Sequence, residues 1–238
     1  MSKARRGSAS AQRRHATSAL RSSRRDSSRG TTVAVVAVVL FATVVGVGLY
    51  FAQRPAPVLV PPDATPQGVV VGQADAPVTI DLYEDFQCPA CQQFEERIGP
   101  TVDELVEAGR AKVVYHPVAY LDRFSSTRYS SRSSAAAGCA AAAGVFPRFT
   151  DLLFANQPPE GGDGLPTARL VELGRQAGAT GEDFARCVRE ERLAGWTANL
   201  TETASRRGIN ATPTVLVNGE PVPRLSAQAL RDAVAGAT

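Results

Sequence analysis

Residues 78–93 read VTIDLYEDFQCPACQQ, where an apolar, β-branched run is followed by two cysteines separated by two residues. The run favours a short strand, because valine, isoleucine and threonine pack well in sheets. From Pro89 to Gly109 apolar residues recur every three or four positions, which is typical of an amphipathic helix. We expect Pro100 to kink this helix and Gly109 to end it. Cys88 and Cys91 therefore lie where a strand is followed by the first turn of a helix.

Strands and helices predicted around this unit complete an α/β pattern. Further valine-rich extended segments are expected at 68–72, 112–120 and 212–222. Asn218-Gly219 in the last of these segments is a strong signal for a hairpin turn. Residues 225–237 predict a closing helix with Ser226 as its N-cap.

Two segments of different composition define the domain limits. Residues 120–210 are rich in alanine and are broken by glycine and proline, which predicts an all-helical insertion of about four helices. Residues 53–67, QRPAPVLVPPDATPQ, contain five prolines and predict a semi-rigid spacer. One folded domain is therefore expected at 68–238.

The N-terminal tail, residues 1–32, carries nine of the 26 Lys and Arg residues and a single acid, Asp26. Its charge of +8, subtracted from the net +3 of the chain, leaves −5 for the remainder. A mildly acidic folded part does not support nucleic-acid binding, which depends on basic surfaces. We expect the tail to be disordered in the cytoplasm or to lie on anionic lipid headgroups.

Residues 33–52 carry no charge and are almost wholly apolar. A helix from Val33 to Phe51 would be roughly 28 Å long, which matches the core of a bilayer. The basic flank orients such an anchor with its N-terminus in the cytoplasm and the following domain outside. A cleaved signal peptide is the main alternative, but its apolar part is usually about 7 to 15 residues long. A buried core helix is a weaker alternative, because no face is polar.

The four cysteines of an exported domain allow three pairings, and Cys88 with Cys91 plus Cys139 with Cys187 needs the fewest assumptions. The first pair could instead hold half of a zinc site, but only His116 and the other two cysteines are candidates for the remaining ligands. A purely structural bridge is a third interpretation. We favour a redox couple, because the position of the pair provides a mechanism.

That mechanism depends on the start of the helix opened by Pro89. The helix dipole and its unpaired N–H groups favour the thiolate of Cys88 and lower its pKa below the free value of ~8.5. Cys91, one turn further on, would be shielded. A substrate thiolate would attack Cys88 in the disulfide form, and the substrate's second thiol would later expel Cys88 as a stabilised thiolate. A stabilised reduced form makes the protein an oxidant.

Three motifs together resemble the thioredoxin superfamily, and more closely its DsbA-like branch: DFQCPACQQFE at 85–95, DLLFANQ at 151–157 and GINATPTVLVNG at 208–219. The resemblance covers residues 68–237. The whole arrangement, with its N-terminal apolar segment, is similar to membrane-anchored disulfide oxidoreductases of actinobacteria. It implies a thioredoxin fold with a helical insertion, preceded by one transmembrane helix. It also implies that no metal, nucleotide or other cofactor is needed.

Site residues follow from the same resemblance. Pro213 is implied to be a cis-proline that faces the cysteines, with the backbone of Thr212 pairing with an extended substrate; an ordinary trans proline is the alternative. Pro89 and Ala90 are implied to tune the couple. Strongly oxidising relatives have Pro-His between the cysteines, so we expect a less acidic Cys88 here. The Cys139-Cys187 bridge is expected to pin the insertion.

One departure from the family concerns acids near the cysteines. Many relatives carry a buried acid six residues before the first cysteine, where this chain has Leu82. Asp81, Glu84 and Asp85 lie nearby, but alternation along the strand sends Asp81 to the opposite face from Leu82. We expect these acids to be solvated at the strand end; a role in moving protons is the alternative. His116 is expected to be packed or half-exposed and not catalytic.

The sequence thus predicts a membrane-tethered enzyme that oxidises cysteine pairs in unfolded exported proteins through Cys88 and Cys91. By family analogy, a membrane partner of the DsbB or vitamin K epoxide reductase type would recharge it. A disulfide reductase or isomerase of the same fold is the alternative within the enzyme class. A thioredoxin-fold binding or chaperone module without turnover is the alternative outside it.

Overall fold

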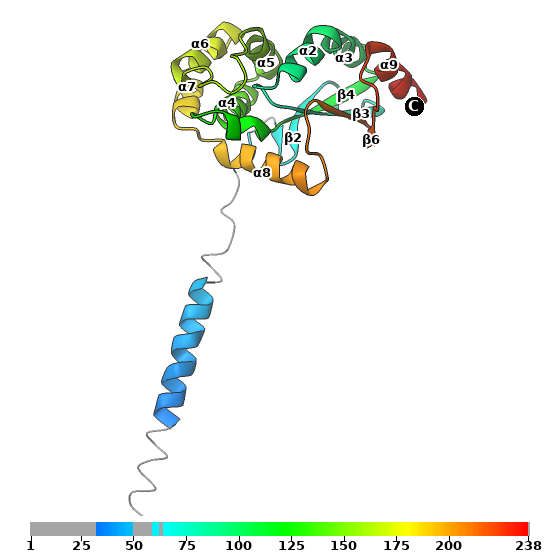
Figure 1. Ribbon diagram of the computed structural model, residues 1–238. Helices are drawn as coiled ribbons and strands as arrows, with labels where there is room; N and C mark the ends of the chain where they lie inside the picture. The colour runs from blue at the N-terminus through cyan, green and yellow to red at the C-terminus, as the bar shows by residue number, and fades with distance from the viewer. Residues whose placement is uncertain (1–31, 50–58, 62–63, 238) are drawn as a thin grey trace, which may run out of the picture. The chain divides into compact units, whose positions relative to one another are not determined.

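The computed structural model of the protein describes residues 32–49, 59–61 and 64–237. The chain divides into two units, residues 1–57 and 58–238. In the first unit the described residues form the helix Thr32–Leu49 (Figure 1, blue). Its mean hydropathy is 2.6 over 18 residues, so it is long and apolar enough to cross a membrane. A signal sequence has the same features. Of the tail predicted at 1–32, residues 1–31 lie outside the described residues, and Thr32 begins the helix.

A six-stranded sheet with the order β1-β2-β4-β3-β5-β6 forms the centre of the second unit. The strands are β1 (Ala64–Thr65), β2 (Gly68–Val71), β3 (Val78–Glu84), β4 (Ala111–Pro117), β5 (Thr214–Val217) and β6 (Glu220–Pro221). The central pair, β3 and β4, is parallel, and the other neighbouring strands are antiparallel. A parallel pair needs a crossover, which α2 (Pro89–Arg97) and α3 (Gly99–Glu107) provide.

Helices cover both faces of this sheet (Figure 1). On one face α2, α3 and α9 (Ala227–Gly236) enclose a core that includes Ile80 and Leu82 of β3. On the other face Tyr83 packs near Ala204 of α8 (Ala194–Arg206). Alternate residues of β3 therefore enter two different cores, as the period of a strand requires.

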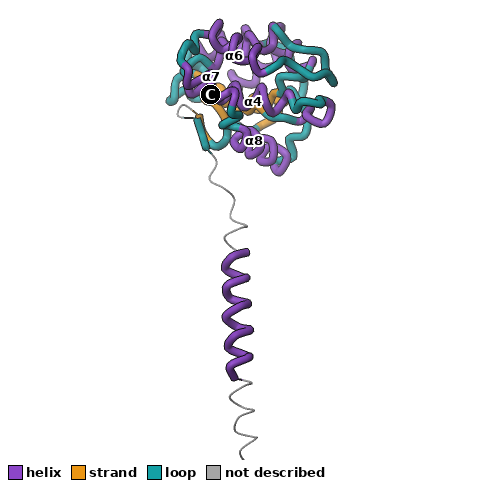
Figure 2. Tube along the Cα trace, turned by 90° about the vertical axis from the view of Figure 1, so that its left-hand side faces the viewer, coloured by secondary structure: helices purple, strands orange, loops and turns teal. Residues whose placement is uncertain are grey.

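The insertion between β4 and β5 contains a 3₁₀ turn and five helices. These are the turn Tyr120–Phe124, α4 (Tyr129–Ala142), α5 (Phe146–Ala155), α6 (Thr167–Ala177), α7 (Glu182–Arg189) and α8. Eleven of the 14 residues of α4 are buried, so this helix is the core of the insertion. Its small side chains permit close packing: a Cβ on Gly138 would lie 2.9 Å from Leu193 and 3.0 Å from Trp196. Figure 2 shows α4, α6, α7 and α8 toward the viewer. The predicted helical insertion is confirmed.

The expected helix over 89–109 is wrong in one respect, because it is two helices. α2 ends at Arg97, and Ile98 leaves helical geometry with φ −122° before α3 begins at Gly99. Pro100 lies in the first turn of α3, where its missing N–H costs no hydrogen bond. In a continuous helix Pro100 would have no N–H to donate to the carbonyl of Glu96 and its ring would clash with that carbonyl, so the chain breaks and restarts where a kink was predicted.

The chain enters the sheet at Ala64, within the segment expected to be a spacer. The indole N–H of Trp196 donates to the carbonyl of Thr65 at 3.0 Å, and the amide of Asn199 donates to the carbonyl of Pro66 at 3.2 Å. These bonds tie the short strand β1 to α8. The sheet therefore starts four residues before the expected limit at Gly68.

Candidate active site

Cys88 and Cys91 lie at the junction of β3 and α2. Cys88 is the N-cap of α2, with extended backbone angles, and Pro89 opens the helix. The backbone N–H of Cys91 donates to the carbonyl of Cys88 at 3.0 Å, so Cys91 belongs to the first turn. Both side chains are thiols in this structure. Cys88 is 8% exposed and Cys91 is fully buried, so only Cys88 has access to a partner molecule.

The two thiols have opposite electrostatic surroundings. A hydrogen bond from the Cys91 thiol lowers the pKa of Cys88 to about 5, with further help from Thr212 and the N–H groups of Cys91 and Ala90, although burial opposes them. Burial raises the pKa of Cys91 well above its ordinary value, and the charge of Glu84 adds to this effect. The Cys88 thiolate is thus stabilised at neutral pH while Cys91 keeps its proton.

The loop before β5 forms the wall opposite the cysteines. The Thr212-Pro213 peptide bond is cis. The Cys88 thiol lies 3.5 Å from the carbonyl oxygen of Thr212 and donates to it. Ala90, Pro213 and Leu225 line a shallow hollow of about 160 Å³ together with four residues of α2 and its end. An extended chain that reached Cys88 would therefore meet the backbone of Thr212 and this hollow.

Acidic side chains at the end of β3 are buried, so the expected solvated strand end is wrong. Glu84 is 4% exposed and Asp85 is fully buried. Asp85 accepts hydrogen bonds from the N–H groups of Gln87 and Leu121, both at 2.9 Å, and from the hydroxyl of Ser130 at 2.6 Å. The chain passes beneath the insertion at this point, which removes water from both carboxyls. Asp85 joins the active-site loop to the insertion.

Glu84 has no such set of donors. Its Oε1 atom makes no hydrogen bond with the described part of the chain. Burial raises its pKa well above the ordinary value of 4.5, and the nearby Glu95 carboxyl adds to the shift. Burial also raises the pKa of the half-buried Glu95 to about 7. Because Leu82 and Glu84 are two residues apart on β3, both face the same side of the sheet as α2. Alternation along β3 could therefore have placed Glu84 on the side of the sheet that α2 covers.

Asp81 lies on the opposite face, as alternation predicted. Its carboxylate is 2.8 Å from Nε2 of His116, and the imidazole stacks on Tyr83 with ring centroids 4.0 Å apart. His116 is 4% exposed, so it is a packed side chain. The expectation of a packed histidine agrees with this geometry.

Gln157, which sequence reasoning did not single out, supports the active-site loop. Its amide donates to the carbonyls of Phe86 at 3.1 Å and Cys88 at 3.0 Å. In the other direction, the amide of Gln92 donates to the carbonyl of Phe154 at 3.0 Å. These bonds join α5 to α2. Gln157 is the last residue of the motif DLLFANQ at 151–157, which carried part of the family resemblance, so that motif could have indicated it.

The remaining cysteines form a second, separate pair. Cys139 of α4 and Cys187 of α7 are joined by a disulfide that closes a segment of 48 residues, with Cα atoms 6.0 Å apart. Among the described residues, no group of three or more His, Cys, Asp or Glu side chains is placed to hold a metal ion.

Comparison with known proteins places this site in a family. A thioredoxin family model matches residues 64–235, which include the sheet, both cysteine pairs and the cis-proline. The chain belongs to this thioredoxin family. The solved structure of the disulfide bond oxidoreductase DsbG of Mycobacterium tuberculosis is 36% identical, with a TM-score of 0.60 over 73% of this chain and 85% of that one. DsbA of the same organism is 33% identical, with a TM-score of 0.57 over 74% and 98%. The resemblance to DsbA-like proteins is confirmed.

Curated relatives match over a shorter part of their own length. The Na⁺/H⁺ antiporter NhaA 3 of Salinispora tropica is 33% identical over 154 residues, which are 63% of this chain and 21% of the antiporter. The serine/threonine-protein kinase PknE of Mycobacterium tuberculosis is 31% identical over 159 residues, or 28% of the kinase. The chain thus spans about a fifth to a quarter of the length of these relatives. Antiport and kinase activity are not carried over to it.

Proposed function

We propose that the protein is a membrane-tethered thiol-disulfide oxidoreductase that oxidises cysteine pairs in exported polypeptides. The observation that carries this proposal is the contrast between the two thiols: an acidic Cys88 at a helix N-terminus and a fully buried Cys91 of raised pKa. Similarity to the DsbG and DsbA structures supports the same reaction class.

The reaction begins with the Cys88-Cys91 disulfide. A substrate thiolate attacks Sγ of Cys88, the S–S bond breaks, and Cys91 leaves and takes up a proton. The substrate's second thiolate then attacks the substrate sulfur that is bonded to Cys88, and Cys88 leaves as a thiolate. The substrate loses two electrons and two protons and gains one disulfide. The protein gains the two electrons and one proton, which is on Cys91, and the second proton goes to solvent. Because Cys88 is stabilised as a thiolate, this direction is favoured.

Glu84 is the proposed proton donor to Cys91. A thiolate that forms at a fully buried position is costly, so the leaving sulfur needs a proton during the step. Burial favours the protonated form of Glu84, and its carboxyl is close enough to affect the pKa of Cys91. The half-buried carboxyl of Glu95 lies near Glu84 and raises its pKa, and it is the proposed next carrier of the proton toward solvent. This arrangement would replace the acid that relatives carry at the position of Leu82.

Substrate would bind as an extended chain along Thr212-Pro213, with its side chains against the hollow at Ala90 and Leu225. Such a site reads the backbone and leaves room for varied side chains, which suits unfolded proteins. The apolar helix Thr32–Leu49 would anchor the protein, with the domain outside the cytoplasm. A membrane partner of the DsbB or vitamin K epoxide reductase type would reoxidise the couple.

The deciding experiment is the reduction potential of the Cys88-Cys91 couple in the full chain, embedded in lipid nanodiscs and equilibrated with glutathione. Differential alkylation and peptide mass spectrometry separate this couple from Cys139-Cys187. A value of about −120 to −180 mV supports a disulfide donor, whereas a value near about −270 mV makes the protein a reductase.

A second measurement tests turnover against a binding module. After mild reduction, iodoacetamide should modify Cys88 rapidly at pH 7 and leave Cys91 unmodified, because only Cys88 is both accessible and ionised. If neither cysteine reacts, the couple does not turn over and the protein is a thioredoxin-fold binding module.

A further inference from the structure

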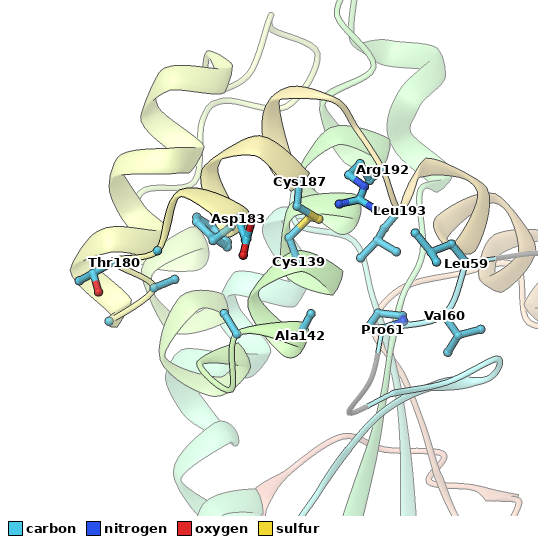
Figure 3. A pocket seen from close by; sticks show the side chains of 15 residues that line it. Leu59, Val60, Pro61, Cys139, Ala142, Thr180, Asp183, Cys187, Arg192 and Leu193 are labelled. Atoms are coloured by element: carbon cyan, nitrogen blue, oxygen red, sulfur yellow. A yellow bond between two sulfur atoms is a disulfide. The ribbon is translucent and has the colours of Figure 1, made fainter.

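A second cavity lies within the insertion (Figure 3). Its volume is about 510 Å³, and small-molecule sites span roughly 300 to 1,000 Å³. The end of α4, the α6–α7 loop, α7, the turn before α8 and residues 59–61 enclose it. Neither Cys88, Cys91 nor Pro213 is among the described residues that line it. The cavity is therefore separate from the proposed redox site and can be tested independently of it.

Small and apolar side chains form most of its wall. Ala142 of α4 and Leu193 before α8 point toward the space around the Cys139-Cys187 disulfide, and Leu59 closes one side (Figure 3). The disulfide fixes α4 against α7. The bond limits the movement of α4 relative to α7 at this wall, which favours a site that is formed before a ligand binds.

One positive charge at the cavity has no counter-ion among the residues that the structure describes. Asp183 and Arg192 are the charged residues of the wall. Asp183 is paired with Arg186, and the neighbouring Arg189 is paired with Glu182. The exposed guanidinium of Arg192 makes no ion pair with the described part of the chain. An apolar chamber with one unbalanced cation at its edge is complementary to an apolar body with one negative charge.

We propose that this cavity binds a single-chain amphipathic carboxylate, the chemistry of a fatty acid. The alkyl chain occupies the chamber, where loss of apolar surface to water drives binding, and the carboxylate lies on Arg192. A single apolar cavity beside a single cation fits a ligand with one alkyl chain and one negative charge. This disfavours phospholipids, which have two chains. Leu59 follows the apolar helix, which ends at Leu49, by ten residues of sequence. A membrane anchor there would supply such amphiphiles.

Occupancy has a chemical consequence for the second disulfide. Cys139 is 2% exposed, whereas Cys187 is half-buried and lines the cavity. A thiol reductant reaches the bond through Cys187, so an alkyl chain in the chamber blocks it. Bound carboxylate therefore protects the Cys139-Cys187 bridge from reduction.

Photolabelling tests the site directly. The full chain in phosphatidylcholine nanodiscs is irradiated with a diazirine-bearing dodecanoate, and labelled peptides are mapped by mass spectrometry. Labels are expected on α4 and α7. Arg192→Leu should reduce them by about fivefold, the effect of one exposed charge pair of about 1 kcal/mol. Ala142→Trp, an exposed position that fills the chamber, should remove them. Arg189→Leu is the matched control, because Arg189 is a paired cation outside the wall, and it should label as the parent does.

A reduction assay provides an independent readout. Dodecanoate should slow the reduction of Cys139-Cys187 by dithiothreitol in the parent and have no effect in Ala142→Trp, while dodecanol should protect less. Equal labelling of Arg192→Leu, Ala142→Trp and the parent would overturn the site. Equal protection by dodecanol would overturn the role of Arg192, and protection by phosphatidylglycerol alone would overturn the single-chain assignment.

Discussion

The two cysteine pairs of this domain have the same side chains and opposite environments. Cys88 and Cys91 lie at the start of α2, where the N–H groups of Ala90 and Cys91 and the neighbouring Thr212 stabilise the thiolate of Cys88. Cys139 and Cys187 lie within α4 and α7, with their N–H groups engaged in helices and the sulfurs packed between them. The surroundings of the first pair stabilise a thiolate, whereas the second pair is held by packing between two helices. The comparison teaches that position in the fold decides whether two cysteines exchange electrons or hold helices together.

The largest expected effect separates the pairs by activity. Cys88→Ser should lower the rate of oxidation of a reduced two-cysteine peptide at least about a thousandfold, because the attacked sulfur is lost. Cys91→Ser should be equally inactive as an oxidant, since it cannot form the disulfide. The rate is followed by the fluorescence change as the peptide closes.

The double variant Cys139→Ala/Cys187→Ala is the matched control for that assay. It should keep the rate within about twofold, because the second pair does not contact the reacting sulfurs. Loss of activity in this variant, while it remains folded, would make the second bridge a redox relay and remove the proposed distinction.

Stability should show the reverse order. Cys139→Ala/Cys187→Ala should lower the free energy of unfolding by about 3 to 4 kcal/mol, because a closed loop of nearly fifty residues becomes free in the unfolded chain. Urea denaturation in nanodiscs, with Cys88 alkylated in all samples, measures the difference. A loss below about 1 kcal/mol would show that the helices of the insertion hold together without the bridge.

A substitution at Glu84 tests whether this buried acid donates a proton to Cys91. Glu84→Gln should slow peptide oxidation by about a hundredfold, the lower end of the usual contribution of one positioned acid. Its pKa is raised in the folded state, so its contribution to stability is fully present below the ordinary value of 4.5 and is lost as pH rises through the folded pKa. The unfolding free energy of the parent should therefore fall with rising pH more steeply than that of Glu84→Gln. Glu96→Gln, an exposed acid on α2, is the control and should change neither quantity.

The same contrast shows which features the sequence could predict. The location of Cys88 followed from local pattern, because a strand, C-x2-C and a helix are contiguous. The burial of Glu84 did not, since it depends on helices of the insertion that cover the strand end. Gln157 reaches the carbonyl of Cys88 from 69 residues away, which no local pattern records. The sheet begins at Ala64 because β1 pairs with β2 and receives a hydrogen bond from Trp196 of α8. The proline-rich sequence around Ala64 had favoured a spacer.

The smallest expected effect concerns the tuning of the first pair. Ala90 is exposed between the two cysteines, so Ala90→His adds an imidazole without disturbing the core. A positive charge near Cys88 favours its thiolate, and an exposed pair of up to about 1 kcal/mol corresponds to roughly 0.7 pKa unit and about 20 mV. The couple should become more oxidising by this amount, measured against glutathione at pH 6, where the imidazole is charged, and the change should shrink at pH 8. An equal shift at both pH values would assign the effect to the size of the side chain and not to its charge. Ala90→Phe supplies that comparison and should leave the potential unchanged.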